Sequence, residues 1–194
     1  MKNWYIVSSP PYFGGIEIGT TPSAAQSTVI GRVVSTTLYD ITGDPSQLHL
    51  QLYFQIVGVK DSKASTIFKG HEYSRDYLRS LVRRGSTRID GIFNVSTNDG
   101  YKLRISVVAF SVLRAKSSQI TEVRKIIQKH LEEKAKTLSF DQFVQEAVLG
   151  KIASDIYNEA KKVVPIRHVG VRKSVLLSSV GEAQEAEELE IKAA

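Results

Sequence analysis

Two alternating segments joined by a tight-turn sequence constrain the fold more than any other feature of this chain. Apolar residues or glycine occupy every second position from Ile89 to Val95 and again from Tyr101 to Ala109, with Asn98-Asp99-Gly100 between them. A period of two is typical of strands with one buried face. Asp-Gly supplies the positive φ angles that tight hairpin turns require. The sequence therefore predicts an antiparallel hairpin, and with it a sheet.

Further short strands are expected in residues 3–7, 30–38, 48–56, 64–70 and 166–177. The clearest is 48–56, where leucine, phenylalanine and isoleucine alternate with polar residues. Three prolines, Pro10, Pro11 and Pro22, exclude a helix from residues 9–27. That stretch is expected to form an extended, turn-rich arm.

Helical spacing appears in three places. Residues 74–84 predict a short helix with Ser74 as its N-cap and Gly85 as its C-terminal stop. After residue 113 the chain predicts two longer helices, one carrying an apolar stripe from Ile120 to Leu131 and one from Ser139 to Pro165 that Gly150 weakens or bends. The fold class is therefore α+β: a mostly antiparallel curled sheet or small β-barrel with one inserted short helix and two C-terminal helices. Many short strands need their edges closed or covered, which favours the curled form.

The chain of 194 residues is expected to form one domain with appendages. Residues 1–28 are predicted as an N-terminal arm with one short strand, residues 29–177 as the barrel-plus-helices domain, and residues 178–194 as an acidic, disordered tail. Net charge is +6, but it is divided unequally: residues 1–180 carry 25 basic and 15 acidic side chains, whereas residues 181–194 carry one lysine and five glutamates. A basic body points first to nucleic acid or another polyanion, with a merely solvated cationic surface as the alternative.

Several function classes are unsupported by the residue inventory. The chain has no cysteine, which excludes a zinc ribbon, an iron–sulfur cluster and a thiol nucleophile. No apolar run reaches the length of a spanning helix, and the N-terminus lacks the apolar core of a signal peptide, so a cytoplasmic protein without a membrane partner is expected.

Catalytic and cofactor-binding motifs are also absent or incomplete in this sequence. The four histidines lie far apart in the sequence, without the spacing of paired metal ligands, and no metal or other cofactor is expected. The Gly14–Gly19 segment has the glycine spacing of a phosphate loop, but Thr20 replaces the required lysine. A hydrolase site built from His49, His71 and an acid such as Asp44 or Asp76 is the weakest alternative. The sequence favours a protein that is not an enzyme and has no small-molecule substrate.

The most informative basic feature is a set of five arginines within a stretch of 14 residues. The same stretch contains no lysine and a single acid, Asp76. In a helix over 74–84, Arg75, Arg79 and Arg83 would lie in a row. The apolar residues Leu78, Leu81 and Val82 would lie on the opposite side. Arginine favours planar, bidentate phosphate contacts, whereas solubility alone would accept lysine as readily. We name this set the arginine patch: Arg75, Arg79, Arg83, Arg84 and Arg88.

Two further features accompany the arginine patch. Tyr73 and Tyr77 could stack on bases, although Tyr77 fits a core position better. A second basic cluster surrounds Pro165 and consists of Lys161, Lys162, Arg167, His168, Arg172 and Lys173.

Several segments resemble one known family in the same order along the chain. They include Ile30-Gly31-Arg32-Val33-Val34, the run from Arg75 to Arg84, Asp99-Gly100-Tyr101, and Val148-Leu149-Gly150-Lys151-Ile152-Ala153-Ser154. Together they resemble the archaeal and eukaryotic small-subunit ribosomal protein family S-one-e, formerly S-three-A-e. The resemblance spans about residues 2–177, and the shortness of the chain resembles the archaeal branch.

The resemblance implies a non-enzymatic, structural ribosomal protein with a β-barrel and helices. It would sit on the platform of the small subunit, near the messenger exit and the 3′ end of the small-subunit rRNA. Its partners would be that rRNA, neighbouring platform proteins and, near the exit, mRNA. The alternative is an RNA- or DNA-binding module that acts off the ribosome. The residues predicted to bind rRNA are Arg75, Arg79, Arg83, Arg84, Arg88, Lys102, Arg104, Lys161, Lys162, Arg167, Arg172 and Lys173.

Overall fold

The computed structural model describes residues 2–177 and divides into two compact units. The first unit comprises residues 2–70 with 176–177, and the second comprises residues 71–175. The predicted acidic tail, residues 178–194, lies outside the described residues. The division of the chain at residue 28, between arm and domain, stays a prediction.

The first unit is built from strands and short helical turns. Its elements are β1 (Asn3–Ser8), β2 (Glu17–Ser23), β3 (Val33–Thr37), α1 (Leu38–Thr42), β4 (Leu50–Lys60) and most of β5 (Lys63–Tyr73), with 3-10 turns at Pro11–Phe13, Gln26–Thr28 and Pro45–Gln47. β2 lies in the stretch expected to be an extended arm and pairs antiparallel with β1 from Asn3↔Ser23 to Ser8↔Glu17. Pro22 is tolerated there because β2 is an end strand, where a missing N–H costs no ladder bond.

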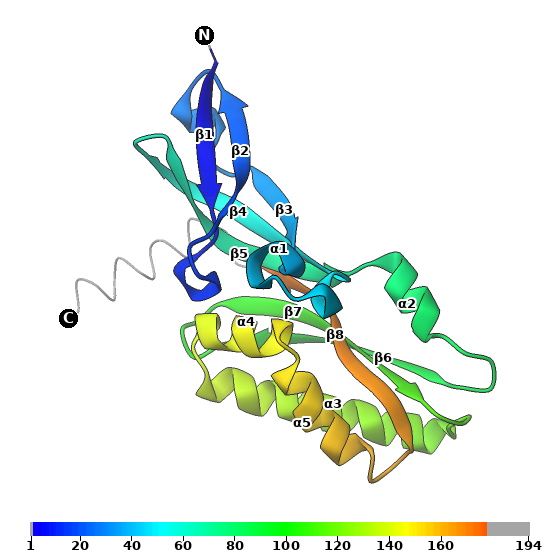
Figure 1. Ribbon diagram of the computed structural model, residues 1–194. Helices are drawn as coiled ribbons and strands as arrows, with labels where there is room; N and C mark the ends of the chain where they lie inside the picture. The colour runs from blue at the N-terminus through cyan, green and yellow to red at the C-terminus, as the bar shows by residue number, and fades with distance from the viewer. Residues whose placement is uncertain (1, 178–194) are drawn as a thin grey trace. The chain divides into compact units, whose positions relative to one another are not determined.

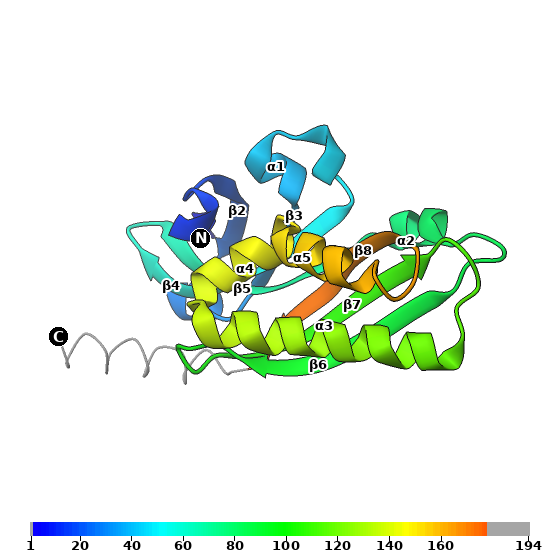
Figure 2. The ribbon, with the colours of Figure 1, turned by 90° about the horizontal axis from the view of Figure 1, so that it is seen from below.

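The second unit places helices on one face of a sheet. Its elements are α2 (Arg75–Leu81), β6 (Arg88–Ser96), β7 (Lys102–Ser111), α3 (Ser117–Thr137), α4 (Phe140–Val148), α5 (Lys151–Ala160) and β8 (Ile166–Leu176). α3, α4 and α5 lie against the same face of β6, β7 and β8 (Figures 1 and 2). Leu103 and Ile105 of the hairpin are fully buried. So are Ile127 and Leu131 of the apolar stripe of α3.

The predicted hairpin is confirmed. β6 and β7 pair antiparallel from Arg88↔Phe110 to Ser96↔Lys102, and Gly100 in the turn has φ +82°. The predicted strand over 166–177 is also confirmed as β8.

The α+β class is confirmed, but of the two predicted forms of the sheet the small β-barrel is wrong. Hydrogen-bonded strands follow the order β2-β1-β5-β8-β7-β6, with β4 pairing to β5 and β3 pairing to β4, and within residues 2–177 the end strands do not pair with each other. The sheet is therefore open, and it is mixed because β1 runs parallel to β5 at Ile6↔Lys63. β6 is an end strand, and Arg124 of α3 donates from Nε to its Asp90 carbonyl at 3.0 Å.

The C-terminal helical region also differs from its prediction. The single helix expected from Ser139 to Pro165 is two helices, α4 and α5, so three helices rather than two follow the hairpin. Gly150 lies between them with φ +83°, a left-handed conformation that ends a helix and that glycine adopts without steric cost. The glycine therefore breaks the helix instead of bending it.

Candidate nucleic-acid interface

All twelve residues predicted to bind RNA lie in the second unit. The arginine patch begins on α2, whose start is fixed by the expected cap: the Ser74 side chain accepts a hydrogen bond from the Tyr77 N–H at 3.4 Å. Arg75 and Arg79 lie one turn apart on this helix and are exposed.

The predicted row of three arginines is wrong at its third member. α2 ends at Leu81, and Val82 adopts an extended conformation with 52% of its surface exposed. Because Val82 is not buried, packing does not stabilise a further helical turn after Leu81. Gly85, which has a positive φ, then turns the chain. Arg83 and Arg84 consequently lie in the connection between α2 and β6, where the Ser86 hydroxyl donates to the Arg83 carbonyl at 2.7 Å.

Aromatic rings hold α2 in place. The Tyr73 and Tyr77 rings meet edge to face with centroids 5.4 Å apart, and Tyr77 meets His168 of β8 at 6.2 Å. Burial raises the pKa of Tyr73 to about 12. Gly170 allows the close approach of Tyr73, since a Cβ at that position would lie 2.5 Å from the tyrosine oxygen. The two tyrosines therefore pack within the protein, as expected for Tyr77, rather than standing open for bases to stack on.

The five arginines divide by whether the protein supplies a partner. Arg88 reaches Asp90 at 2.9 Å, and Arg79 lies 4.0 Å from Asp76, both pairs being substantially exposed. The side chains of Arg75, Arg83 and Arg84 form no ion pair or hydrogen bond with any residue between 2 and 177. These three keep their full donor capacity for an external anion.

The cluster around Pro165 does not form a single patch. The Arg167 guanidinium donates to the carbonyl of Leu81, the last residue of α2, so Arg167 lies against the end of that helix. Lys173 instead pairs with Glu72 of β5 at 2.9 Å. The six-residue interval between Arg167 and Lys173 corresponds to about 20 Å along a strand, which separates them. Lys161 and Lys162 are exposed at the turn that precedes β8, and Arg172 is half-buried on β8.

The last two predicted residues lie on the hairpin. Lys102 and Arg104 are exposed on β7, opposite Ser96 and Asn94 of β6. The Arg104 Nε donates to Asn94 Oδ1 at 3.1 Å.

Two cations that the sequence reading missed lie close to the arginine patch in the fold. Arg114 and Lys116 are exposed in the connection between β7 and α3, and the Ala115 N–H between them donates to Thr87 Oγ1 at 3.0 Å. Thr87 directly precedes β6, so this bond joins their connection to the one that carries Arg83 and Arg84. The available signal was a run with two cations and no acid, Val112-Leu113-Arg114-Ala115-Lys116, at the end of the predicted hairpin.

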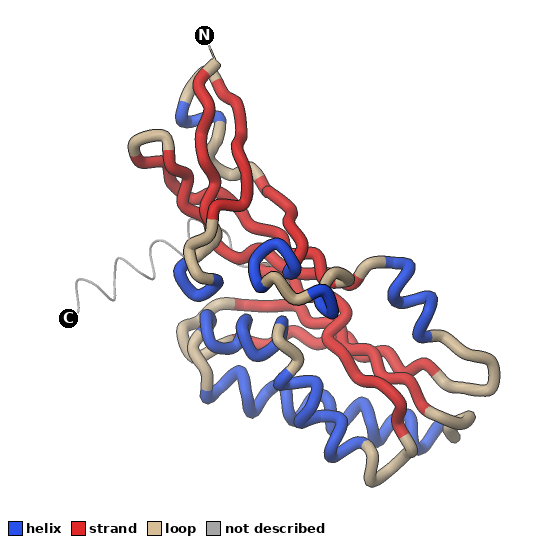
Figure 3. The backbone as a smooth tube through the Cα atoms, in the orientation of Figure 1, coloured by secondary structure: helices blue, strands red, loops and turns tan. Residues whose placement is uncertain are grey.

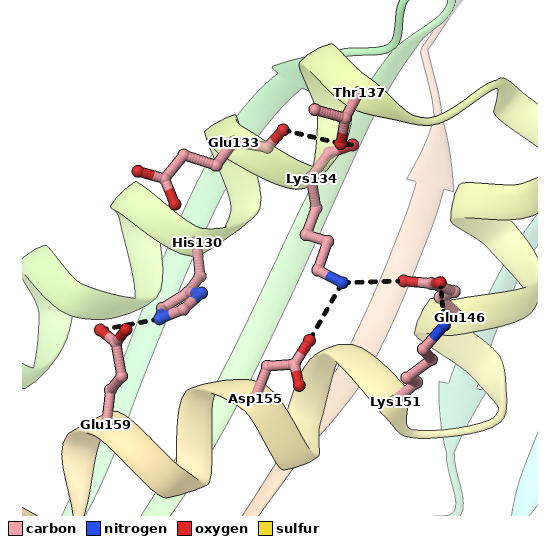
Figure 4. Close-up of polar contacts among 8 residues, drawn as sticks. All are labelled: His130, Glu133, Lys134, Thr137, Glu146, Lys151, Asp155 and Glu159. Atoms are coloured by element: carbon pink, nitrogen blue, oxygen red, sulfur yellow. Dashed lines mark hydrogen bonds and ion pairs between the residues drawn. The ribbon is translucent and has the colours of Figure 1, made fainter.

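Two lysines of the helices that cover the sheet, Lys134 and Lys151, are paired with carboxylates of neighbouring helices (Figure 4). Lys134 of α3 lies 3.3 Å from Glu146 of α4 and 3.0 Å from Asp155 of α5, and Lys151 lies 2.5 Å from Glu146. Burial works to raise the pKa of Glu146, but the hydrogen bonds from Lys151 and Lys134 outweigh it and lower that pKa below its ordinary value. This network joins three helices and leaves little charge for an external ligand.

The hydrolase alternative finds no geometric support. His71 is buried, with Nε2 3.0 Å from the Val171 carbonyl and Nδ1 2.7 Å from the Ser174 hydroxyl. Burial lowers the pKa of His71 to about 4, so the ring is neutral at pH 7 and serves the packing of β5 against β8. Within the described part of the chain, no three histidine or acidic side chains are grouped as they would be to hold a metal ion. None of the helices in residues 2–177 is long and apolar enough to cross a membrane.

Comparison with known proteins decides the family. Residues 1–179 match the model of the Ribosomal S3Ae family. The chain belongs to this family. The resemblance found in the sequence is thereby confirmed, and the family consists of structural ribosomal proteins that are not enzymes.

Archaeal relatives agree with that membership. The chain is 52% identical over 177 residues to the small ribosomal subunit protein eS1 of Staphylothermus marinus, which covers 91% of this chain and 84% of the relative. It is 47% identical over 179 residues to the protein of the same name from Sulfurisphaera tokodaii, covering 92% of this chain and 93% of the relative.

Proposed function

We propose that this chain is a structural protein of the small ribosomal subunit that binds small-subunit rRNA through the basic surface of its second unit. The observation that carries the proposal is the family match over residues 1–179, together with archaeal relatives named small ribosomal subunit protein eS1. The chain spans more than four fifths of each of these two relatives, so the comparison covers most of their length.

The chemistry of the second unit supports RNA as the ligand. Arg75, Arg83 and Arg84 are exposed and have no partner among the described residues, and the guanidinium group matches phosphate oxygens in a bidentate geometry. Phosphate contacts of this kind position a protein on RNA without reading its sequence. The location on the platform, near the messenger exit and the 3′ end of the rRNA and beside other platform proteins and mRNA, is part of the proposal and comes from the family resemblance.

Charge reversal of the arginine patch tests the proposal. A variant with glutamate at all five positions of the patch should fail to enter small subunits when expressed beside the wild-type chain, because five repulsive contacts replace five attractive ones. Circular dichroism of the purified variant checks that it is folded. Incorporation at the wild-type level would remove the arginine patch from the RNA interface.

The alternative function is an RNA- or DNA-binding module that works off the ribosome with the same surface. Sucrose-gradient sedimentation of native lysate at low and at high salt separates the two functions. A ribosomal component moves with small subunits and remains there at moderate salt. A free module stays in the light fractions under both conditions.

A further inference from the structure

Three connections gather at one end of the second unit and are joined by hydrogen bonds. They are residues 82–87 between α2 and β6, 112–116 between β7 and α3, and 161–165 between α5 and β8. Figure 3 shows these loops at the same end of the β6–β7–β8 sheet. Thr87 bonds to Ser111 and to the Ala115 N–H, and the Val112 N–H donates to the Pro165 carbonyl at 2.8 Å. We name these three connections the loop end.

All charged side chains of the loop end are basic. Its three connections contain no aspartate or glutamate, and each contributes two exposed cations. Within residues 2–177 none of these side chains forms an ion pair, although the Lys161 Nζ lies 5.7 Å from the centre of the Tyr157 ring. The six cations are Arg83, Arg84, Arg114, Lys116, Lys161 and Lys162.

Such an arrangement is suited to a polyanion. Six like charges held at one end of a sheet repel one another, and the interconnecting hydrogen bonds keep the loop backbones from spreading apart. A ligand that carries regularly spaced negative charge relieves this repulsion, and the fixed backbone reduces the entropy lost on binding. Three of the six cations are arginines, whose planar guanidinium groups match phosphate oxygens in a bidentate geometry.

We propose that the loop end is a binding site for the sugar–phosphate backbone of small-subunit rRNA, and that Arg114 and Lys116 belong to it with the cations of the other two connections. This inference rests on the proposed function and extends it. The RNA contacts three loops that are far apart in the sequence, rather than following the helical face of α2 alone.

The test measures binding of the purified full-length chain to small-subunit rRNA transcribed in vitro, by filter binding between 50 and 400 mM KCl. Replacing Arg114 and Lys116 by glutamine removes two exposed cations whose side chains form no ion pair within residues 2–177. If each neutralises one phosphate, the affinity should fall roughly 25- to 60-fold at 100 mM salt, and the slope of log affinity against log salt should become shallower by about 1.4 to 1.8. A second variant, Lys161→Gln with Lys162→Gln, should give a similar loss through the third connection.

The matched control neutralises two exposed lysines on α3, Lys125→Gln with Lys136→Gln, and should change neither affinity nor slope. Equal behaviour of control and loop variants would overturn the loop-end site while leaving the proposed function standing, provided that the wild-type chain binds with a steep salt slope. A wild-type chain that does not bind this RNA would overturn both. Loop variants that bind RNA normally but fail to enter subunits would assign the loop end to an acidic protein neighbour and overturn the RNA site.

Discussion

The helices α3, α4 and α5 and the loop end of the second unit both carry cationic side chains, but they differ in whether acidic side chains lie nearby. On α3, α4 and α5, Lys134 and Lys151 meet carboxylates within 3.3 Å, and the network is partly buried. At the loop end, the arginines and lysines are exposed without acidic partners among the described residues. The net charge of the chain does not distinguish these two uses of cations, but the position of the acids does.

The difference separates cations that hold the fold from cations that are available for a ligand. Paired cations change stability when they are removed, because they leave a partner carboxylate half-buried and unsatisfied. Unpaired cations change affinity instead, because their main interaction is with whatever anion binds. Variants at the loop end should therefore lower RNA affinity and leave stability nearly unchanged. Variants of the paired cations should lower stability and leave RNA affinity unchanged.

The largest effect is expected from three neutralised arginines of the loop end. Arg83→Gln, Arg84→Gln and Arg114→Gln together should lower affinity for small-subunit rRNA roughly 130- to 500-fold at 100 mM salt, on the basis of one phosphate lost for each arginine. The melting temperature should stay within about 2 °C of wild type, because surface substitutions without partners have small effects on stability. Filter binding and thermal melting measure the two quantities. A large drop in melting temperature would show that these arginines also hold the fold.

A buried histidine extends the comparison to a second group with protein partners. Because the folded-state pKa of His71 is about 4, below its ordinary value of 6.5, the unfolded chain takes up the proton first as the pH falls. The contribution of His71 to stability is therefore full above pH 6.5 and is lost between pH 6.5 and 4, on the order of 2 kcal/mol between pH 7 and pH 5. Urea unfolding should show this loss in the wild type and a smaller one in His71→Gln. The same pH dependence in both proteins would contradict the assignment.

A moderate effect on stability alone is expected at Lys134. Lys134→Ala removes the cation that joins α3 to α4 and α5 and should lower the free energy of unfolding by about 1 to 2 kcal/mol, less than a fully buried pair would, because the site is partly exposed. RNA affinity should remain at the wild-type value. The lowered pKa of Glu146 gives a stabilisation that is present above pH 4.5 and is lost as the pH falls through the folded-state pKa. The difference between the two proteins should therefore shrink as the pH falls below 4.5. Urea unfolding at pH 7 and pH 3.5 measures it.

The smallest effect is expected at Arg167, which could belong either to the cations that hold the fold or to those that bind the ligand. Arg167 was predicted to bind RNA, but its guanidinium bonds to the end of α2. If Arg167 positions the connection between α2 and β6, Arg167→Ala should weaken RNA binding about threefold to tenfold and leave the salt slope unchanged. This loss is expected when about 10–30% of the molecules keep that connection in the conformation that binds RNA. A slope that falls by about 0.7 to 0.9 would instead make Arg167 a direct phosphate ligand. Arg167→Lys serves as the control for the charge without the planar geometry.

Local features were predictable from sequence, and non-local ones were not. The hairpin over β6 and β7 follows from a period of two and an Asp-Gly turn, both of which act between neighbouring residues. The open, mixed sheet depends on β1 pairing parallel to β5, nearly 60 residues away, for which no local pattern exists. The end of α2 at Leu81 was missed because helix length there depends on which apolar residues find a surface to cover.

The candidate site divides in the same way. The arginine patch was visible because its members are close in sequence. Arg114 and Lys116 were missed because their relation to Arg83 and Arg84 arises only when the hairpin closes and Thr87 meets Ser111 and Ala115. A cluster that forms from three connections distant in sequence has no regular residue spacing from which it could be predicted.

Directed cleavage of rRNA within assembled small subunits tests the central claim most directly. Since the chain has no cysteine, a hydroxyl-radical probe can be attached to a single introduced cysteine, at Ser118 near the loop end or at Gln142 on α4. The account predicts strong backbone cleavage from position 118 and weak or no cleavage from position 142. Strong cleavage from position 142 with none from position 118 would show that the face with paired charges meets the RNA and would contradict the account.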